Sequence, residues 1–161
     1  MIAPSTKAID GLQVNFVPLD ILDVSHLDAR LLALLMPLMA TLDLTDLSKD
    51  IDVSLLTSKL SGVLSGLTKA SQQALIVDSL MGSTVVAPGR PAIEINDAAS
   101  LNKAFSGCSV ETLYKVLWEA WRFNKLTPFV LAGRFGVKIA TILTPDQPTE
   151  DPEPHGLKLA K

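Results

Sequence analysis

Few residues of this 161-residue sequence could carry nucleophilic or acid–base chemistry. Nucleophilic catalysis needs a nucleophile beside a base, with a third group that orients the base. His26 and His155 are the two sources of imidazole, and Cys108 is the one thiol. His26 falls at the start of an expected helix, and Cys108 has no histidine near it in sequence. The sequence therefore indicates no catalytic residue.

Four aspartates, Asp43, Asp46, Asp50 and Asp52, lie close together and invite comparison with a calcium-binding loop. An EF-hand loop requires a glycine at its sixth position and a glutamate at its twelfth, and neither follows here. We interpret these aspartates as polar and capping residues between two helices. Sequence patterns for phosphate, dinucleotide and zinc binding are also missing. We therefore expect no enzyme, no cofactor and no bound metal.

Length and composition favour one soluble domain. A chain of 161 residues can bury a core of its own without disulfides. The single cysteine fits a reducing cytosol, and no secretory signal peptide is expected at the first residues. The most apolar stretch, residues 31–42, is shorter than the about 20 residues that cross a membrane. We therefore expect no membrane partner.

Charge is spread unevenly along the chain. The formal net charge is −3, with acidic residues concentrated in residues 1–52 and basic residues in 103–138. This asymmetry would suit either head-to-tail contacts between subunits or two ordinary solvated faces. Basic residues of the second region alternate with aromatic ones, which is also typical of nucleic-acid binding. Because Trp121 falls on a predicted core face and the chain is acidic, we expect no nucleic-acid partner.

Periodicity predicts a mainly α fold: a small helical domain of five to six helices with one or two short β-hairpins. The N-terminal β segment spans residues 8–19, and a second hairpin spans 83–95. Helices are expected over residues 25–40, 53–67, 68–81, 97–105, 109–124 and 127–135, with a further strand at 137–143. Pro37 is expected to kink or end the first helix. Residues 1–143 form one domain, and 144–161 form a Pro-rich acidic flexible tail.

Two of these helices carry more apolar residues than one buried face needs. The first helix is apolar almost all round, so either it is the central helix of the domain or one of its faces meets another chain. Methionine suits an adaptable binding surface, and tryptophan suits an interface anchor. The candidate protein-binding residues are Leu32, Met36, Met39, Leu117, Trp118, Trp121, Phe123 and Phe129.

The order of these elements resembles the tail assembly chaperones of long-tailed bacteriophages. The resemblance rests on a short β opening, a Leu-rich helix, the junction Leu67-Thr68, and a late helix over residues 113–124 that runs into Leu126-Thr127-Pro128-Phe129. It covers roughly residues 16–135 in order and character, without a sharp motif. The bulky Trp121-Arg122-Phe123 and the Pro-rich tail depart from the family pattern and leave the partner surface open.

The resemblance implies a protein that binds the long, aggregation-prone tape measure protein and keeps it soluble until the tail tube polymerises. It further implies self-association, a contact with the tail tube protein, no cofactor, and a place in the host bacterial cytoplasm rather than in the mature virion. A structural tail or connector subunit retained in the virion is the main alternative. A small nucleic-acid-binding regulator is a third.

Overall fold

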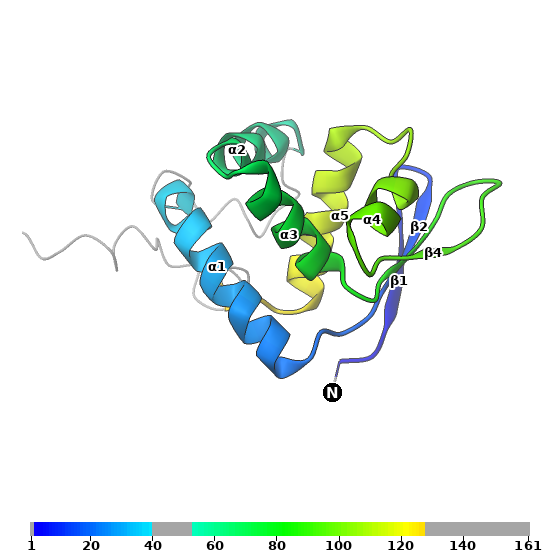
Figure 1. Cartoon of the computed structure of the whole chain (residues 1–161), viewed down its shortest axis with the longest axis horizontal. Coiled ribbons are helices and arrows are strands. Elements are labelled where there is room, and N and C mark those ends of the chain that lie inside the picture. The colour runs from blue at the N-terminus through cyan, green and yellow to red at the C-terminus, as the bar shows by residue number, and fades with distance from the viewer. Residues whose placement is uncertain (1, 40–52, 128–161) are drawn as a thin grey trace, which may run out of the picture.

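The computed structural model describes residues 2–39 and 53–127, and these form an α+β fold (Figure 1). The described part holds five helices and one four-stranded antiparallel sheet. The prediction of a mainly α fold with separate hairpins was wrong. The prediction failed because β2 pairs with β3, which joins two hairpins that are far apart in sequence into one sheet. The predicted strand at 137–143 and the tail at 144–161 lie outside the described residues.

The sheet has the strand order β1-β2-β3-β4. Its strands are β1 (Ser5–Ile9), β2 (Leu12–Phe16), β3 (Thr84–Val86) and β4 (Ile93–Glu94). Asp10 and Gly11 connect β1 to β2 with φ angles of 47° and 84°, the two positive values of a type I′ turn. This turn fixes the register that pairs Ile9 with Leu12, and Val14 then pairs with Val85. Alternate residues of β2 are therefore buried on one face of the sheet.

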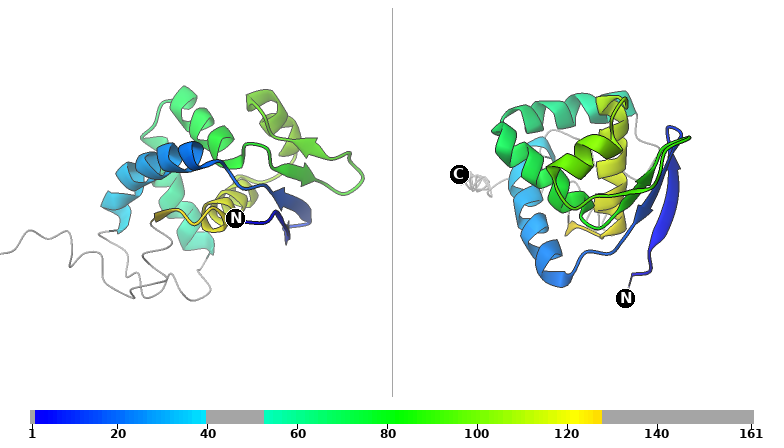
Figure 2. Two further views of the ribbon diagram at one scale, coloured as in Figure 1. Left: turned by 90° about the horizontal axis from the view of Figure 1, so that it is seen from below. Right: turned by 45° about the vertical axis from the view of Figure 1, so that its right-hand side comes forward.

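The helices are α1 (Ile21–Met39), α2 (Val53–Ser65), α3 (Lys69–Leu80), α4 (Ala98–Ala104) and α5 (Val110–Phe123). They lie on one side of the sheet, and α5 contacts both β1 and β2 as well as α2 and α3 (Figures 1 and 2). The core lies between the sheet and these helices. Its largest fully buried side chains are Trp121, Phe16, Leu27, Leu31, Leu60, Leu64, Leu75, Leu80, Ile95, Leu117 and Leu126.

Helix starts follow from side-chain caps. Thr68 caps α3 as predicted, because its hydroxyl accepts a hydrogen bond from the Ser71 backbone N–H at 3.2 Å. Asp97 caps α4 in a reciprocal arrangement with Ser100. The backbone N–H of Ser100 is the main reason that the pKa of the Asp97 carboxyl is lowered.

The first helix was predicted to start too late. It begins at Ile21 rather than Ser25, because Asp20 caps it: the Asp20 carboxylate accepts hydrogen bonds from the backbone N–H groups of Leu22 and Asp23, both at 2.9 Å. The bond from Asp23 is the main cause of the lowered pKa of Asp20. The helix also runs through Pro37 to Met39, so the proline does not end it there.

Candidate functional site

The predicted binding residues divide between the core and partly exposed positions. Leu117 and Trp121 on α5 are 0% and 1% exposed, so this conformation does not offer them to a partner. Leu32 on α1, and Trp118 and Phe123 on α5, are partly buried. Met36 and Met39 belong to α1, but their side chains lie outside the described part of the structure, as does Phe129 entirely.

Trp121 is fixed in place by packing and by hydrogen bonds. Its indole N–H donates to the Ser79 hydroxyl at 2.9 Å, and that hydroxyl donates to the Leu75 carbonyl at 2.7 Å. Ser79 is itself 2% exposed, so the polar group that the tryptophan brings into the core has a buried partner. Trp121 therefore ties α5 to α3.

The aromatic end of α5 also faces inward. Phe123 packs against Phe16 of β2 with ring centroids 5.8 Å apart. Next to it, Asn124 is buried: its side-chain oxygen accepts a hydrogen bond from the Leu19 N–H at 3.1 Å, and its amide donates to the Ala120 carbonyl. Phe123 thus holds α5 against the sheet, and most of its apolar surface is already used within the domain.

The most exposed apolar side chains of the described chain lie at the start of α1. Ile21 and Leu22 are each 78% exposed. At 100° per residue, Ile21 lies within about 20° of Leu32, so these two side chains point the same way from α1. Leu32 is partly buried and lies about 16 Å further along the helix, so we call the exposed pair Ile21 and Leu22 the α1 surface.

Asp28 lies on the same side of α1, between Ile21 and Leu32. Its carboxylate accepts hydrogen bonds from the backbone N–H and the hydroxyl of Thr127, both at 2.6 Å. The chain after α5 is therefore attached to the middle of α1, and the buried Leu126 precedes the attachment point. Two residues further along α1, Arg30 forms an ion pair with Asp78 of α3 at 2.6 Å. These contacts make α1 a well-supported scaffold for its exposed first turn.

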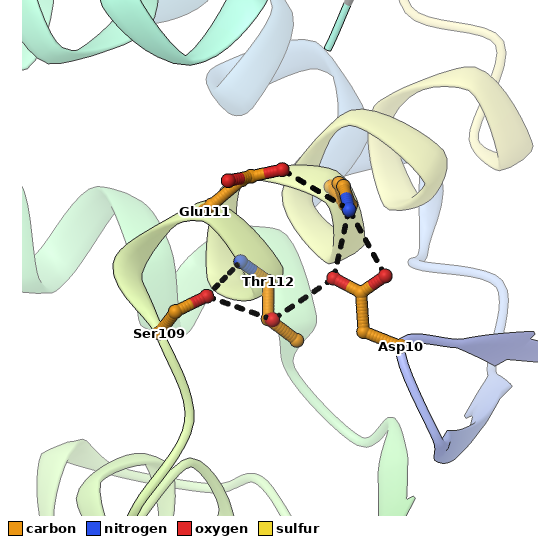
Figure 3. Close-up of polar contacts among 5 residues, drawn as sticks. Asp10, Ser109, Glu111 and Thr112 are labelled. Carbon is orange, nitrogen blue, oxygen red and sulfur yellow. Dashed lines mark hydrogen bonds and ion pairs between the residues drawn. The ribbon is translucent and has the colours of Figure 1, made fainter. Parts of the chain in front are cut away.

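A polar cluster joins the β1–β2 turn to the start of α5 (Figure 3). The Lys115 ammonium donates to both oxygens of the Asp10 carboxylate at 2.9 Å and lies 3.2 Å from Glu111. The Thr112 hydroxyl also donates to Asp10 at 2.9 Å. Ser109 caps α5 by accepting from the Thr112 N–H at 3.1 Å. Because the Thr112 proton goes to Asp10, the Ser109 hydroxyl donates its own proton to the Thr112 oxygen.

Charge in this cluster is arranged for stability rather than for proton transfer. The hydrogen bond from Lys115, and then that from Thr112, lower the pKa of Asp10. The bonds to Asp10 and then to Glu111 raise the pKa of Lys115. A carboxylate with a lowered pKa is a weak base, and the hydrogen bonds of Ser109 and Thr112 described above join them to each other and to Asp10 rather than to an imidazole. The cluster fastens the hairpin to α5.

Within residues 2–39 and 53–127, no three His, Cys, Asp or Glu side chains gather closely enough to hold a metal ion. No helix in that same part of the chain has the length and apolarity needed to cross a membrane. The aspartates considered for calcium, and His155, fall outside it. His26 is exposed on α1, and Cys108 is partly buried with a free thiol.

Comparison with known proteins assigns no relative: neither a protein-family model, nor a curated protein, nor a solved structure matches this chain.

Sequence reasoning missed Ile21 and Leu22, the most exposed large apolar residues of the described ranges. The helix was expected to start after them, which left them in a connecting segment. The pair Asp20 and Asp23, three residues apart, was the feature that indicates an earlier start, since the first of them accepts the backbone N–H of the second. An earlier start places two large aliphatic residues in the first turn, where few neighbours cover them.

Proposed function

We propose that this protein is a tail assembly chaperone that binds the tape measure protein of a long-tailed phage and keeps it soluble until the tail tube polymerises. The observation that carries the proposal is the exposed pair Ile21 and Leu22 on the α1 surface. Adjacent exposed apolar side chains favour a protein contact more than scattered ones do. The order of elements in the sequence supplies the partner class.

The chemistry of such a partner fits the α1 surface. The resemblance implies a long, aggregation-prone partner, and an exposed apolar stripe on such a chain would bind a complementary apolar surface by the hydrophobic effect. Covering one exposed isoleucine or leucine contributes roughly 1.5–3 kcal/mol before the costs of association. A small pair therefore gives a weak, reversible contact. A chaperone that polymerising tube subunits displace needs such a contact.

Acidic residues beside the pair indicate the charge of the partner segment. Asp20 and Asp23 flank Ile21 and Leu22, and both are exposed. A partner segment with basic residues beside its apolar stripe would meet opposite charge there. We therefore expect the bound segment of the tape measure protein to be an amphipathic helix with lysine or arginine at its margins.

Co-purification tests the proposal. The chain is expressed together with its neighbouring reading frames, and the fraction of a very long, helix-rich protein that stays soluble and co-purifies is measured. The double variant Ile21→Asp, Leu22→Asp should lose most of that protein. The matched control is Val110→Asp on α5, an apolar residue 61% exposed, which should retain it.

Two results would contradict the proposal. In the first, the unmodified chain leaves the long protein insoluble and brings nothing down. In the second, the double variant retains its partner as fully as the Val110→Asp control does, which would remove the α1 surface as the binding site.

A structural subunit of the tail is the second candidate, because β1 is an edge strand among the described residues and could pair with a neighbouring subunit. Mass spectrometry of purified particles separates the two candidates. A chaperone should be missing from them, whereas a structural subunit should be present at a fixed ratio to the tube protein.

A further inference from the structure

β1 is an edge strand of the sheet that the described residues form. It is first in the strand order, and β2 is its single strand neighbour within the described residues. In the right-hand view of Figure 2, β1 lies at the rim of the molecule and the helices lie to one side of the sheet. An edge strand presents a row of backbone donors and acceptors to whatever approaches it.

The register shows which backbone groups point outward. In a two-residue hairpin the residues that flank the turn, here Ile9 and Leu12, exchange both of their backbone hydrogen bonds. Because this pattern alternates along an antiparallel pair, Lys7 also bonds to β2, whereas the N–H and C=O groups of Thr6 and Ala8 point away from it. The free edge therefore offers two donors and two acceptors, next to two small, exposed side chains.

The usual protection of an edge strand is weak here. Pro4 precedes β1 and blocks only its start. Lys7, the one charged residue of β1, forms an ion pair with Glu119 of α5, which draws its side chain toward the helix side of the sheet. Neither residue obstructs the backbone at Thr6 and Ala8.

Beside this edge runs a row of four alternating charges on α5: Glu111, Lys115, Glu119 and Arg122, which we call the α5 charge row. At 100° per residue these side chains fall within an arc of about 80°. Lys115 bonds to Asp10 and Glu119 pairs with Lys7, so the row lies on the side of α5 nearest β1. Its two ends are well exposed: the side chains of Glu111 and Arg122 are 50% and 57% exposed.

The α5 charge row is complementary to itself. Its signs run negative, positive, negative, positive, so an antiparallel copy presents the opposite sign at every position. Glu111 then faces Arg122 of the second copy, and Lys115 faces Glu119 of the second copy. A two-fold axis generates this arrangement, because each contact in such an interface occurs twice.

The same two-fold axis also allows the two β1 strands to pair. Lys115 lies beside Asp10 and Glu119 beside Lys7, so the midpoint of the charge row lies next to Ala8. Antiparallel pairing of two β1 strands with Ala8 opposite Ala8 brings the outward-pointing groups together and puts Lys7 opposite Ile9. The repulsion of two facing lysines is thereby avoided.

The expected distance between the two α5 helices is also compatible with direct helix packing. Paired strands lie about 4.8 Å apart, and α5 contacts both β1 and β2, so the two α5 axes would lie about 10 Å apart. Helices that pack against each other are about 8–10 Å apart. We infer that a second copy of this chain binds here, joining the two sheets through β1 and placing the two α5 charge rows face to face. This inference does not depend on the tape measure proposal.

Charge exchange tests the inference on the full chain. Sedimentation should give a particle of twice 17.2 kDa at micromolar concentration. Arg122→Glu creates two facing pairs of like charge and should raise the dissociation constant roughly tenfold or more. Glu111→Arg alone should do the same, and the double variant Glu111→Arg, Arg122→Glu should restore the dimer. Lys69→Glu on α3 changes the net charge equally and should leave the dimer unchanged.

A backbone variant tests the strand edge separately. Ala8→Pro removes an N–H that points away from β2, so the β1–β2 bonds remain while the contact with the second copy is lost. Circular dichroism checks that each variant is folded. A monomer at about 100 μM, a dimer that Arg122→Glu leaves unchanged, or a charge exchange that fails to restore the dimer would each overturn the inference.

Discussion

The first turn of α1 and the middle of α5 show opposite uses of apolar residues. On α5, Trp121 and Leu117 are buried and Trp121 has a buried hydrogen-bond partner. On α1, Ile21 and Leu22 are almost uncovered, although the helix that carries them is held at Asp28 and Arg30. Among these described residues, the large aromatic and aliphatic side chains on α5 are therefore used within the fold, whereas Ile21 and Leu22 on α1 are left exposed.

The largest loss of stability is expected when the buried Trp121 is replaced. Trp121→Ala should lower the free energy of unfolding by about 3–5 kcal/mol, because it leaves a cavity in the core. Trp121→Phe keeps most of the ring volume and should cost less, mainly through the lost hydrogen bond to Ser79. Urea unfolding followed by circular dichroism measures both. Equal stability of Trp121→Ala and the unmodified chain would mean that this tryptophan does not hold α3 and α5 together.

The attachment of Thr127 to α1 is the next largest effect. Asp28→Ala should cost about 1–3 kcal/mol, because it leaves the backbone N–H and the hydroxyl of Thr127 without their acceptor. Asp28→Asn keeps one acceptor oxygen, so its stability should lie between that of Asp28→Ala and that of the unmodified chain. Hydrogen exchange at the Thr127 amide should accelerate in Asp28→Ala. An unchanged exchange rate there would show that this contact does not secure the end of the described chain.

The polar cluster at Asp10 should contribute less, and its contribution should depend on pH. The pKa of the Asp10 carboxyl is lowered in the folded protein. The stabilisation is therefore fully present above the unfolded pKa of about 3.9, and it is lost as the pH falls through the folded pKa. Asp10→Asn keeps the positive φ that the turn needs and removes the charge.

At neutral pH, Asp10→Asn should lower the unfolding temperature by no more than about 4 °C. Its stability should then fall less steeply than that of the unmodified chain between about pH 5 and pH 3. Asp97→Asn, at a cap distant in sequence from Lys115, serves as the comparison. Parallel pH profiles for Asp10→Asn and the unmodified chain would show that Lys115 does not couple to this carboxylate.

Local elements were predictable from the sequence, and their assembly was not. The turn at Asp10-Gly11 and the caps at Thr68, Asp97 and Ser109 depend on neighbouring residues, so their patterns are visible along the chain. The pairing of β2 with β3 joins segments separated by three helices, and no local pattern encodes it. That single pairing converts two hairpins into a sheet.

The candidate surface was predictable only in part, for a similar reason. Periodicity shows that a helix face is apolar but not whether a neighbour covers it. Trp118, Trp121 and Phe123 were all named as candidate binding residues, yet Trp121 is buried against α3, whereas Trp118 and Phe123 are only partly buried. Ile21 stood outside the predicted helix and was therefore not considered.

The smallest effect on stability is expected where the effect on binding should be largest. Ile21→Asp with Leu22→Asp should change the free energy of unfolding by no more than about 0.5 kcal/mol, because both side chains are 78% exposed. Carboxylates in the first turn of a helix interact favourably with the helix dipole, so the variant could even gain a little stability. Thermal unfolding measures this directly. A loss comparable to that of Asp28→Ala would mean that the pair belongs to the folded domain after all. No loss, together with an insoluble partner, would mean that these two residues are kept apolar for a contact outside this chain.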